Sequence, residues 1–101
     1  MLLYNVTVNI DFSVEEEWKQ WMKEIHIPKV LETGAFISNK MYKLLNEVPD
    51  ATGATYSIQY ICENMAKLDD YMENYAPVLV REHVERYANQ HVAFRSVLEE
   101  V

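Results

Sequence analysis

Three segments of the chain alternate between two sets of side chains at every second residue, and this period limits the possible folds more than any other feature. They are residues 2–10 (LLYNVTVNI), 54–62 (ATYSIQYIC) and 91–98 (HVAFRSVL). Successive side chains of a strand point to opposite faces, so each segment is predicted to be a β-strand. A fourth strand is predicted over residues 36–46, and the turn-forming residues 46–53 would join it to the next strand as a hairpin.

Apolar residues at helical spacing follow the first strand. Ser13 and Glu16 have the spacing of a capping box, which predicts a helix that starts at Ser13. The apolar stripe of this helix consists of Val14, Trp18, Trp21, Met22 and Ile25. Pro28 lacks an N–H group, so the helix is expected to kink or restart near His26 and continue as a short segment from Pro28 to Glu32. Gly34 suits a left-handed C-terminal cap.

A second helical region follows residues 54–62. Asn64 is a predicted N-cap, and Pro77 is expected to break or bend the helix. The stripe before the break consists of Met65, Leu68, Tyr71, Met72 and Tyr75. Beyond it, residues 78–87 place Leu79, His83 and Tyr87 on one helix face.

The order of these elements is β-α-β-β-α-β. It predicts an α+β, ferredoxin-like fold with a four-stranded antiparallel sheet and both helices on one face. The 101 residues are expected to form one domain, 1–101.

The sheet face that the helices leave open has an unusual composition. Even-numbered residues of the three alternating strands are expected to face the helices. The open face would then carry Leu3, Asn5, Thr7, Asn9, Thr55, Ser57, Gln59, Ile61, His91, Ala93, Arg95 and Val97. This set contains neither Lys nor Glu, and Arg95 is its only permanent charge. Small neutral polar groups suit a partly buried surface, so we predict a homodimer in which a second copy covers this face and closes an α/β barrel.

Several polar residues are candidates for binding a small organic ligand, and the predicted ligand-binding set is Asn5, Thr7, Gln59, Arg95 and His83. The alternative for the sheet residues is that they satisfy one another or fix the register of the dimer. His26 titrates near neutral pH and is a candidate general acid or base, or else a structural histidine that ties down the kink.

Other classes of site are disfavoured. His83 with Glu82 and Glu85 matches no zinc-helix motif, so no metal site and no cofactor are predicted. Cys62 is expected to be a buried, inert thiol. The net charge of −7 disfavours nucleic acid and anionic membranes as partners. The sequence has no basic leader and no long apolar run, which leads us to expect a cytoplasmic protein.

The segments HIPKVLETGAF, YNVTVNI, YSIQYICEN and VAFRSVLEEV resemble an uncharacterised bacterial family, domain of unknown function 4286, over nearly the whole chain. The matching positions are Trp18, Trp21, His26, Pro28, Thr33, Gly34, Phe36, Gln59, Tyr60, Pro77, His83, Phe94 and Arg95. This resemblance implies a fold and no activity. The His-x-Pro motif at His26 and Pro28 is also similar to motifs of dimeric α/β-barrel proteins, which include cofactor-free monooxygenases, isomerases and small stress proteins.

Three functions remain open from the sequence. The first is a dimeric α/β barrel that binds a small apolar or anionic molecule near Arg95, Gln59 and His26. The second is a cofactor-independent enzyme, monooxygenase- or isomerase-like, with His26 as acid or base and Arg95 as an oxyanion partner. The third is a structural or partner-binding dimer without a ligand. Whether the protein is an enzyme is left undecided by these residues.

Overall fold

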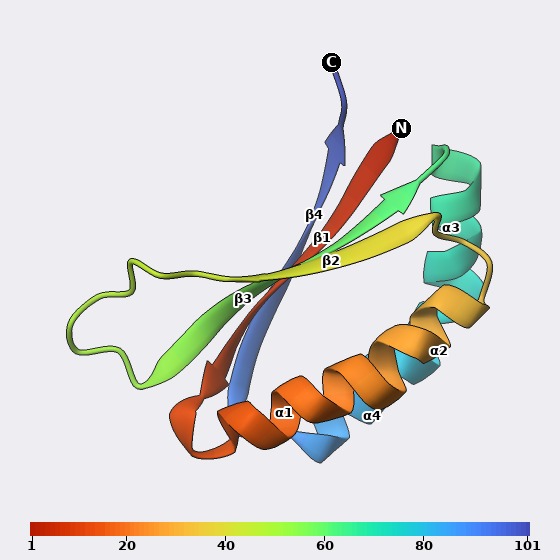
Figure 1. The fold of residues 1–101 in the computed structure, drawn as a ribbon. Helices are drawn as coiled ribbons and strands as arrows, with labels where there is room; N and C mark the ends of the chain where they lie inside the picture. Colours follow the sequence, from red (N-terminus) through yellow and green to blue (C-terminus); the bar gives the residue numbers. More distant parts are fainter.

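The computed structural model describes residues 1–101 and consists of one antiparallel sheet with helices on one of its faces (Figure 1). The strands are β1 (Leu2–Asp11), β2 (Ser38–Lys43), β3 (Gly53–Cys62) and β4 (His91–Glu99), in the order β2-β3-β1-β4. The helices are α1 (Glu15–Trp21), α2 (Ile27–Glu32), α3 (Met65–Asn74) and α4 (Ala76–Arg86). The predicted ferredoxin-like α+β fold is confirmed. None of the helices is long and apolar enough to cross a membrane.

The first helical region begins differently from the capping-box prediction. A short 3-10 helix, η1 (Phe12–Val14), precedes α1, and the Asp11 carboxylate accepts hydrogen bonds from the Ser13 N–H and hydroxyl at 3.2 and 3.1 Å. Asp11 therefore caps the first turn, and the prediction that Ser13 and Glu16 do so was wrong. Asparagine and aspartate compete well with serine for this role because their side-chain oxygens reach the free N–H groups.

The predicted interruption near His26 is a π-helical segment, η2 (Met22–His26), between α1 and α2. The Ile27 N–H bonds to the Met22 carbonyl, five residues earlier, instead of the usual four. The wider turn shifts the residues that follow around the helix axis. Ile25, predicted in the buried stripe, is 43% exposed, and His26 turns toward the sheet instead.

The core lies between the sheet and the helices, as the sequence predicted, but Met65, Met72 and Tyr75 of the predicted second stripe are exposed and only Leu68 and Tyr71 are buried. Trp18, Trp21 and Met22 seal the first helical region onto the sheet, and Leu79 and Tyr87 do the same from the second. Cys62 is buried as expected. Asn64 caps α3 by accepting from the Lys67 N–H at 2.9 Å. Gly34 has the predicted left-handed conformation, with φ of 79°.

The register of β4 overturns the predicted orientation of that strand. Val6 lies opposite Arg95 and Val8 lies opposite Ala93. Directly opposite residues of an antiparallel pair share a face, so Arg95 and Ala93 face the helices. Phe94 is opposite Thr7 on the open face and is 59% exposed.

Candidate functional site

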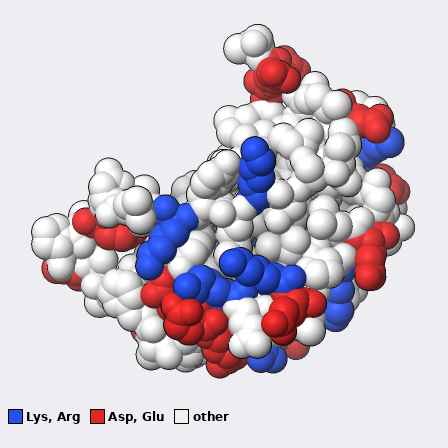
Figure 2. Space-filling view, in the orientation of Figure 1, with Lys and Arg blue, Asp and Glu red and all other residues white.

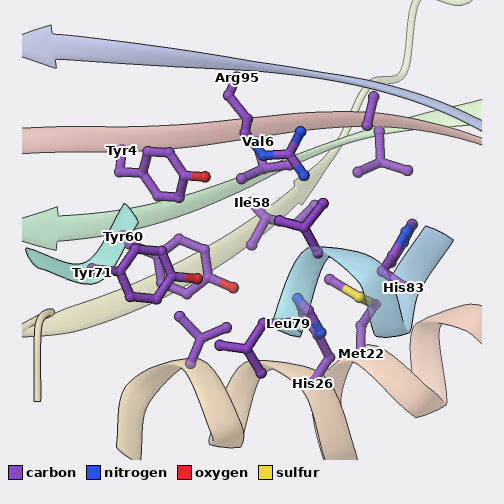
Figure 3. Close-up of a pocket in the computed structure, with 14 residues that line it drawn as sticks. Tyr4, Val6, Met22, His26, Ile58, Tyr60, Tyr71, Leu79, His83 and Arg95 are labelled. Carbon is purple, nitrogen blue, oxygen red and sulfur yellow. The ribbon is translucent and has the colours of Figure 1, made fainter. Parts of the chain in front are cut away.

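A small cavity lies between the sheet and the helices and is the chemically richest part of the molecule (Figure 3). Its volume of about 30 Å³ leaves room for about two water molecules. Strands β1, β3 and β4, the π-helical segment, α2, α3 and α4 all contribute to its wall. The lining residues are Tyr4, Val6, Val8, Met22, His26, Val30, Ile58, Tyr60, Tyr71, Leu79, Val80, His83, Ala93 and Arg95.

Three tyrosines form one end of the cavity. Tyr4, Tyr60 and Tyr71 pack around Phe36, whose ring centroid lies 5.8, 5.0 and 4.8 Å from theirs. Their hydroxyl groups point into the cavity (Figure 3). Burial raises the pKa of all three phenols above the ordinary value, so they stay protonated at neutral pH and can donate hydrogen bonds.

Arg95 supplies the only permanent charge in the lining. Its guanidinium enters the cavity from β4, on the same side as the Tyr4 hydroxyl (Figure 3). Arg95 partly opposes the rise in the Tyr4 pKa that burial causes. None of the five ion pairs of the chain includes Arg95. Arg95 is nevertheless an exposed residue, since β4 is an edge strand.

His26 reaches the cavity from the π-helical segment. Its ring stacks on Trp21, with centroids 5.1 Å apart and planes inclined by 27°. The Nδ1 atom of His26 is buried and has no hydrogen-bond partner in the protein. Burial lowers the pKa of His26 to about 4, so the imidazole is neutral at pH 7. A neutral imidazole with a free ring nitrogen can exchange a proton or a hydrogen bond with a bound molecule.

His83 faces the cavity from α4 and is tied to the fold. The Trp18 indole Nε1–H donates a hydrogen bond to its Nε2 at 2.9 Å. An indole nitrogen can only donate, so Nε2 must be the acceptor and the proton of the neutral ring lies on Nδ1. Burial lowers the pKa of His83 to about 3.

The remaining predicted ligand-binding residues lie on the opposite face of the sheet. Asn5 donates to the Thr7 hydroxyl at 2.9 Å and accepts from Ser57 at 2.5 Å, and Gln59 donates to Ser57 at 3.2 Å. The four side chains thus satisfy one another in a network across β1 and β3. The structure joins Arg95, His26 and His83 in one cavity and separates them from Asn5, Thr7 and Gln59.

The three histidines of the chain lie close together, with His83 between the other two. Its ring centroid is 5.9 Å from that of His26 and 4.7 Å from that of His91. His91 donates from Nδ1 to the Tyr87 carbonyl at 2.8 Å, since a carbonyl can only accept. No group of three or more His, Cys, Asp or Glu side chains is arranged to hold a metal ion.

The tyrosines of the cavity are functional candidates that the sequence reading missed. Their signal was present, because Tyr4 and Tyr60 occupy the even-numbered, helix-facing positions of the first and third strands. The sequence pattern alone indicates core residues at these positions, and only the cavity between them distinguishes a hydroxyl that lines a pocket from one that is merely packed.

A family whose description is "Domain of unknown function (DUF4286)" matches the sequence over residues 1–101. The chain belongs to the DUF4286 family. The resemblance to this family noted from the sequence is therefore confirmed for the whole chain. No curated protein matches this DUF4286 chain.

Solved structures similar to the DUF4286 chain share its fold at low sequence identity. HapK from Hahella chejuensis has a TM-score of 0.72 and 10% identity, covering 100% of this chain and 93% of its own. SnoaB from Streptomyces nogalater, a cofactor-independent oxygenase, has a TM-score of 0.65 and 5% identity, covering 98% and 92%. A dimeric ferredoxin-like protein from an uncultured marine organism has a TM-score of 0.65 and 12% identity, covering 100% and 97%. Likeness at these identities establishes the fold alone.

Proposed function

We propose that the protein binds a small organic molecule in the cavity between its sheet and its helices. The observation that carries this proposal is the meeting of Arg95, His26 and His83 from three separate elements in one largely apolar cavity. Apolar pockets in which a few polar groups with shifted pKa values converge are typical binding sites. The ligand would contact Arg95, His26 and His83, with the hydroxyls of Tyr4, Tyr60 and Tyr71 as further donors.

The small size of the cavity sets a condition on this proposal. Room for about two water molecules holds only part of an organic molecule, so the ligand must extend toward the exposed side of Arg95 or displace wall residues on binding. The edge strand β4 is the wall with the fewest neighbours in the sheet, because β1 alone pairs with it. Movement of β4 is the most direct way to enlarge the cavity.

A second candidate function is cofactor-independent catalysis with His26 as the acid or base. The specific observation in its favour is the π-helical segment, which turns a neutral imidazole with an unpartnered Nδ1 into the cavity. Single π-turns inside α-helices are frequent at functional sites. SnoaB, which shares the fold, is a cofactor-independent oxygenase. Binding is the more economical proposal because it requires contact with His26 but no reaction there.

The protein is also proposed to be a homodimer that pairs through the open sheet face. On this face Val92, Phe94 and Leu98 of β4 are 72, 59 and 50% exposed, beside the polar network of β1 and β3. With Arg95 on the other side, Asp11 at the end of β1 is the only charged residue that β1, β3 and β4 place there by register, and β2 adds Lys40. A face of exposed apolar residues around satisfied polar groups suits burial against a second copy. In this arrangement, Asn5, Thr7 and Gln59 would fix the register of the dimer.

An NMR fragment screen tests the binding proposal. We expect fragments to perturb the backbone signals of the cavity-lining residues in the wild-type protein. Ala93→Met fills the cavity from β4 and should abolish these perturbations, whereas Ala66→Met on the exposed side of α3 should leave them unchanged. If no neutral or charged fragment perturbs the cavity, or if Ala93→Met leaves binding intact, the proposal is wrong.

A further inference from the structure

We infer that the molecule bound in this cavity carries a single negative charge on a carboxylate-type group that Arg95 binds. This inference rests on the proposed binding function and adds the chemical class of the ligand. It is carried by the position of Arg95, by the absence of acidic groups from the cavity wall and by the donor character of the other polar groups.

Arg95 is a cation without an ion-pair partner in an acidic molecule. The chain has 16 acidic residues and 9 lysines and arginines, so carboxylates are plentiful. All five ion pairs nevertheless involve other cations: Lys19, Lys29, Lys43, Lys67 and Arg86. A planar guanidinium that faces an apolar cavity presents several N–H groups in a geometry that fits a carboxylate.

Acidic side chains are absent from the cavity lining. In Figure 2 acidic and basic side chains are mixed along the helices, and the side chain that stands alone in the middle of the view is basic. A neutral ligand would leave the guanidinium with only water and the Tyr4 phenol around it. A doubly charged ligand would bring one charge for which the cavity wall holds no cation. One negative charge matches the single permanent cation of the lining.

The other polar groups of the wall are suited to an acceptor-rich ligand. The hydroxyls of Tyr4, Tyr60 and Tyr71 are protonated and directed into the cavity. Tyr4 lies nearest to Arg95 among them, on the strand next to β4. A carboxylate at the Arg95 side would accept from the guanidinium and from a phenol together, with its apolar part against Val6, Ile58 and Leu79.

Two nearly isosteric probes, propionate and propionamide, separate the charge from the shape of the ligand. Binding is measured by NMR titration of the full-length protein at fixed ionic strength with sodium chloride. We expect propionate to bind in the cavity at least about tenfold more tightly than propionamide, since a charge-assisted bidentate hydrogen bond to a guanidinium is stronger than a hydrogen bond to a neutral amide. Arg95→Gln should remove this difference, whereas Arg81→Gln on the exposed side of α4 should preserve it.

Each outcome bears on one of the two proposals. Equal affinity for the two probes, or a propionate preference that survives Arg95→Gln, overturns the inference of an anionic ligand while the cavity remains a binding site. A cavity that binds neither these probes nor any neutral fragment overturns the proposed function itself. Arg95→Lys serves as a second variant. It keeps the positive charge but cannot make a planar bidentate contact, so it should retain part of the preference for propionate.

Discussion

The indole Nε1–H of Trp18 and the Nε2 of His83 are joined by a 2.9 Å hydrogen bond, across 65 residues of sequence. Trp18 is fully buried on α1 and His83 is 8% exposed on α4, so the bond ties the two helical regions together beneath the sheet. It also sets the tautomer of a histidine that lines the cavity. This one hydrogen bond therefore both stabilises the fold and orients a residue of the candidate site.

Replacing Trp18 with Phe should cost more than the lost volume explains. The variant leaves Nε2 of His83 buried without a donor, and the combined loss should lower the free energy of unfolding by about 2–4 kcal/mol. Trp21→Phe is the matched control, because Trp21 is also buried and no hydrogen bond of its indole nitrogen supports the fold. Chemical denaturation measures both variants. Equal destabilisation by the two would deny the bond any energetic role.

The pH dependence of stability should follow the two buried histidines. Their pKa values are lowered to about 4 for His26 and about 3 for His83, below the value of about 6.5 in the unfolded chain. The unfolded chain then binds more protons between these values, so stability is complete above pH 6.5 and falls as pH decreases. The expected slope is about 1.4 kcal/mol per pH unit for each histidine.

Denaturation of the wild type between pH 5 and 7.5 measures this slope. The window lies above the range in which carboxylates titrate. A variant with both His26→Asn and His83→Asn should show a much flatter profile. A wild-type profile that is flat from pH 7.5 to 5 would contradict the buried, neutral state of the two rings.

The two glycines of the chain should respond differently to alanine. A Cβ atom on Gly53 would overlap the Ile10 carbonyl oxygen and lie 2.6 Å from Oδ1 of Asn9, where β3 begins beside β1. We expect Gly53→Ala to cost about 2–4 kcal/mol, because the backbone of β1 must move. Gly34 has open space around it and a left-handed φ of 79°. Gly34→Ala should cost only about 1 kcal/mol, and thermal unfolding that ranks the two in the reverse order would refute this account.

Phe94 tests the proposed homodimer. Phe94→Lys places a charge on the open sheet face and should convert the dimer to a monomer in light scattering at micromolar concentration. Val78→Lys is the control, because Val78 is a similarly exposed apolar residue of α4, where no interface is proposed. A monomeric wild type would contradict the proposed homodimer. A Phe94→Lys protein that is still dimeric would show that the interface lies elsewhere.

The sequence was sufficient for the order of elements and most of the core, because the period-two and helical patterns are strong where one face is buried. It was insufficient for β4. Val92, Phe94 and Leu98 on one side compete with Ala93 and Val97 on the other, so hydrophobicity does not fix the orientation of this edge strand. The orientation of β4 is set by its pairing with β1, and the local sequence does not predict that pairing.

The π-turn was also beyond a local reading. Pro28 indicated an interruption near His26, but the same sequence is compatible with a kink, a break or a wider turn. Burial of Trp21 and Met22 before the proline and of Val30 after it holds the helix against the sheet on both sides of Pro28. The wide turn exchanges Ile25 for His26 on the inner side. His26, the only predicted site residue of this helix, therefore reaches the cavity because of the π-turn. The regular spacing of an α-helix would not have placed it there.

The most direct test of the central claim is a crystal structure determined after soaking with a mixture of small neutral and anionic fragments. We expect a fragment between the sheet and the helices, with polar atoms within hydrogen-bond distance of Arg95 and His26. Fragments bound only at other surfaces, with the two side chains directed away from each other and the space between them closed, would contradict it.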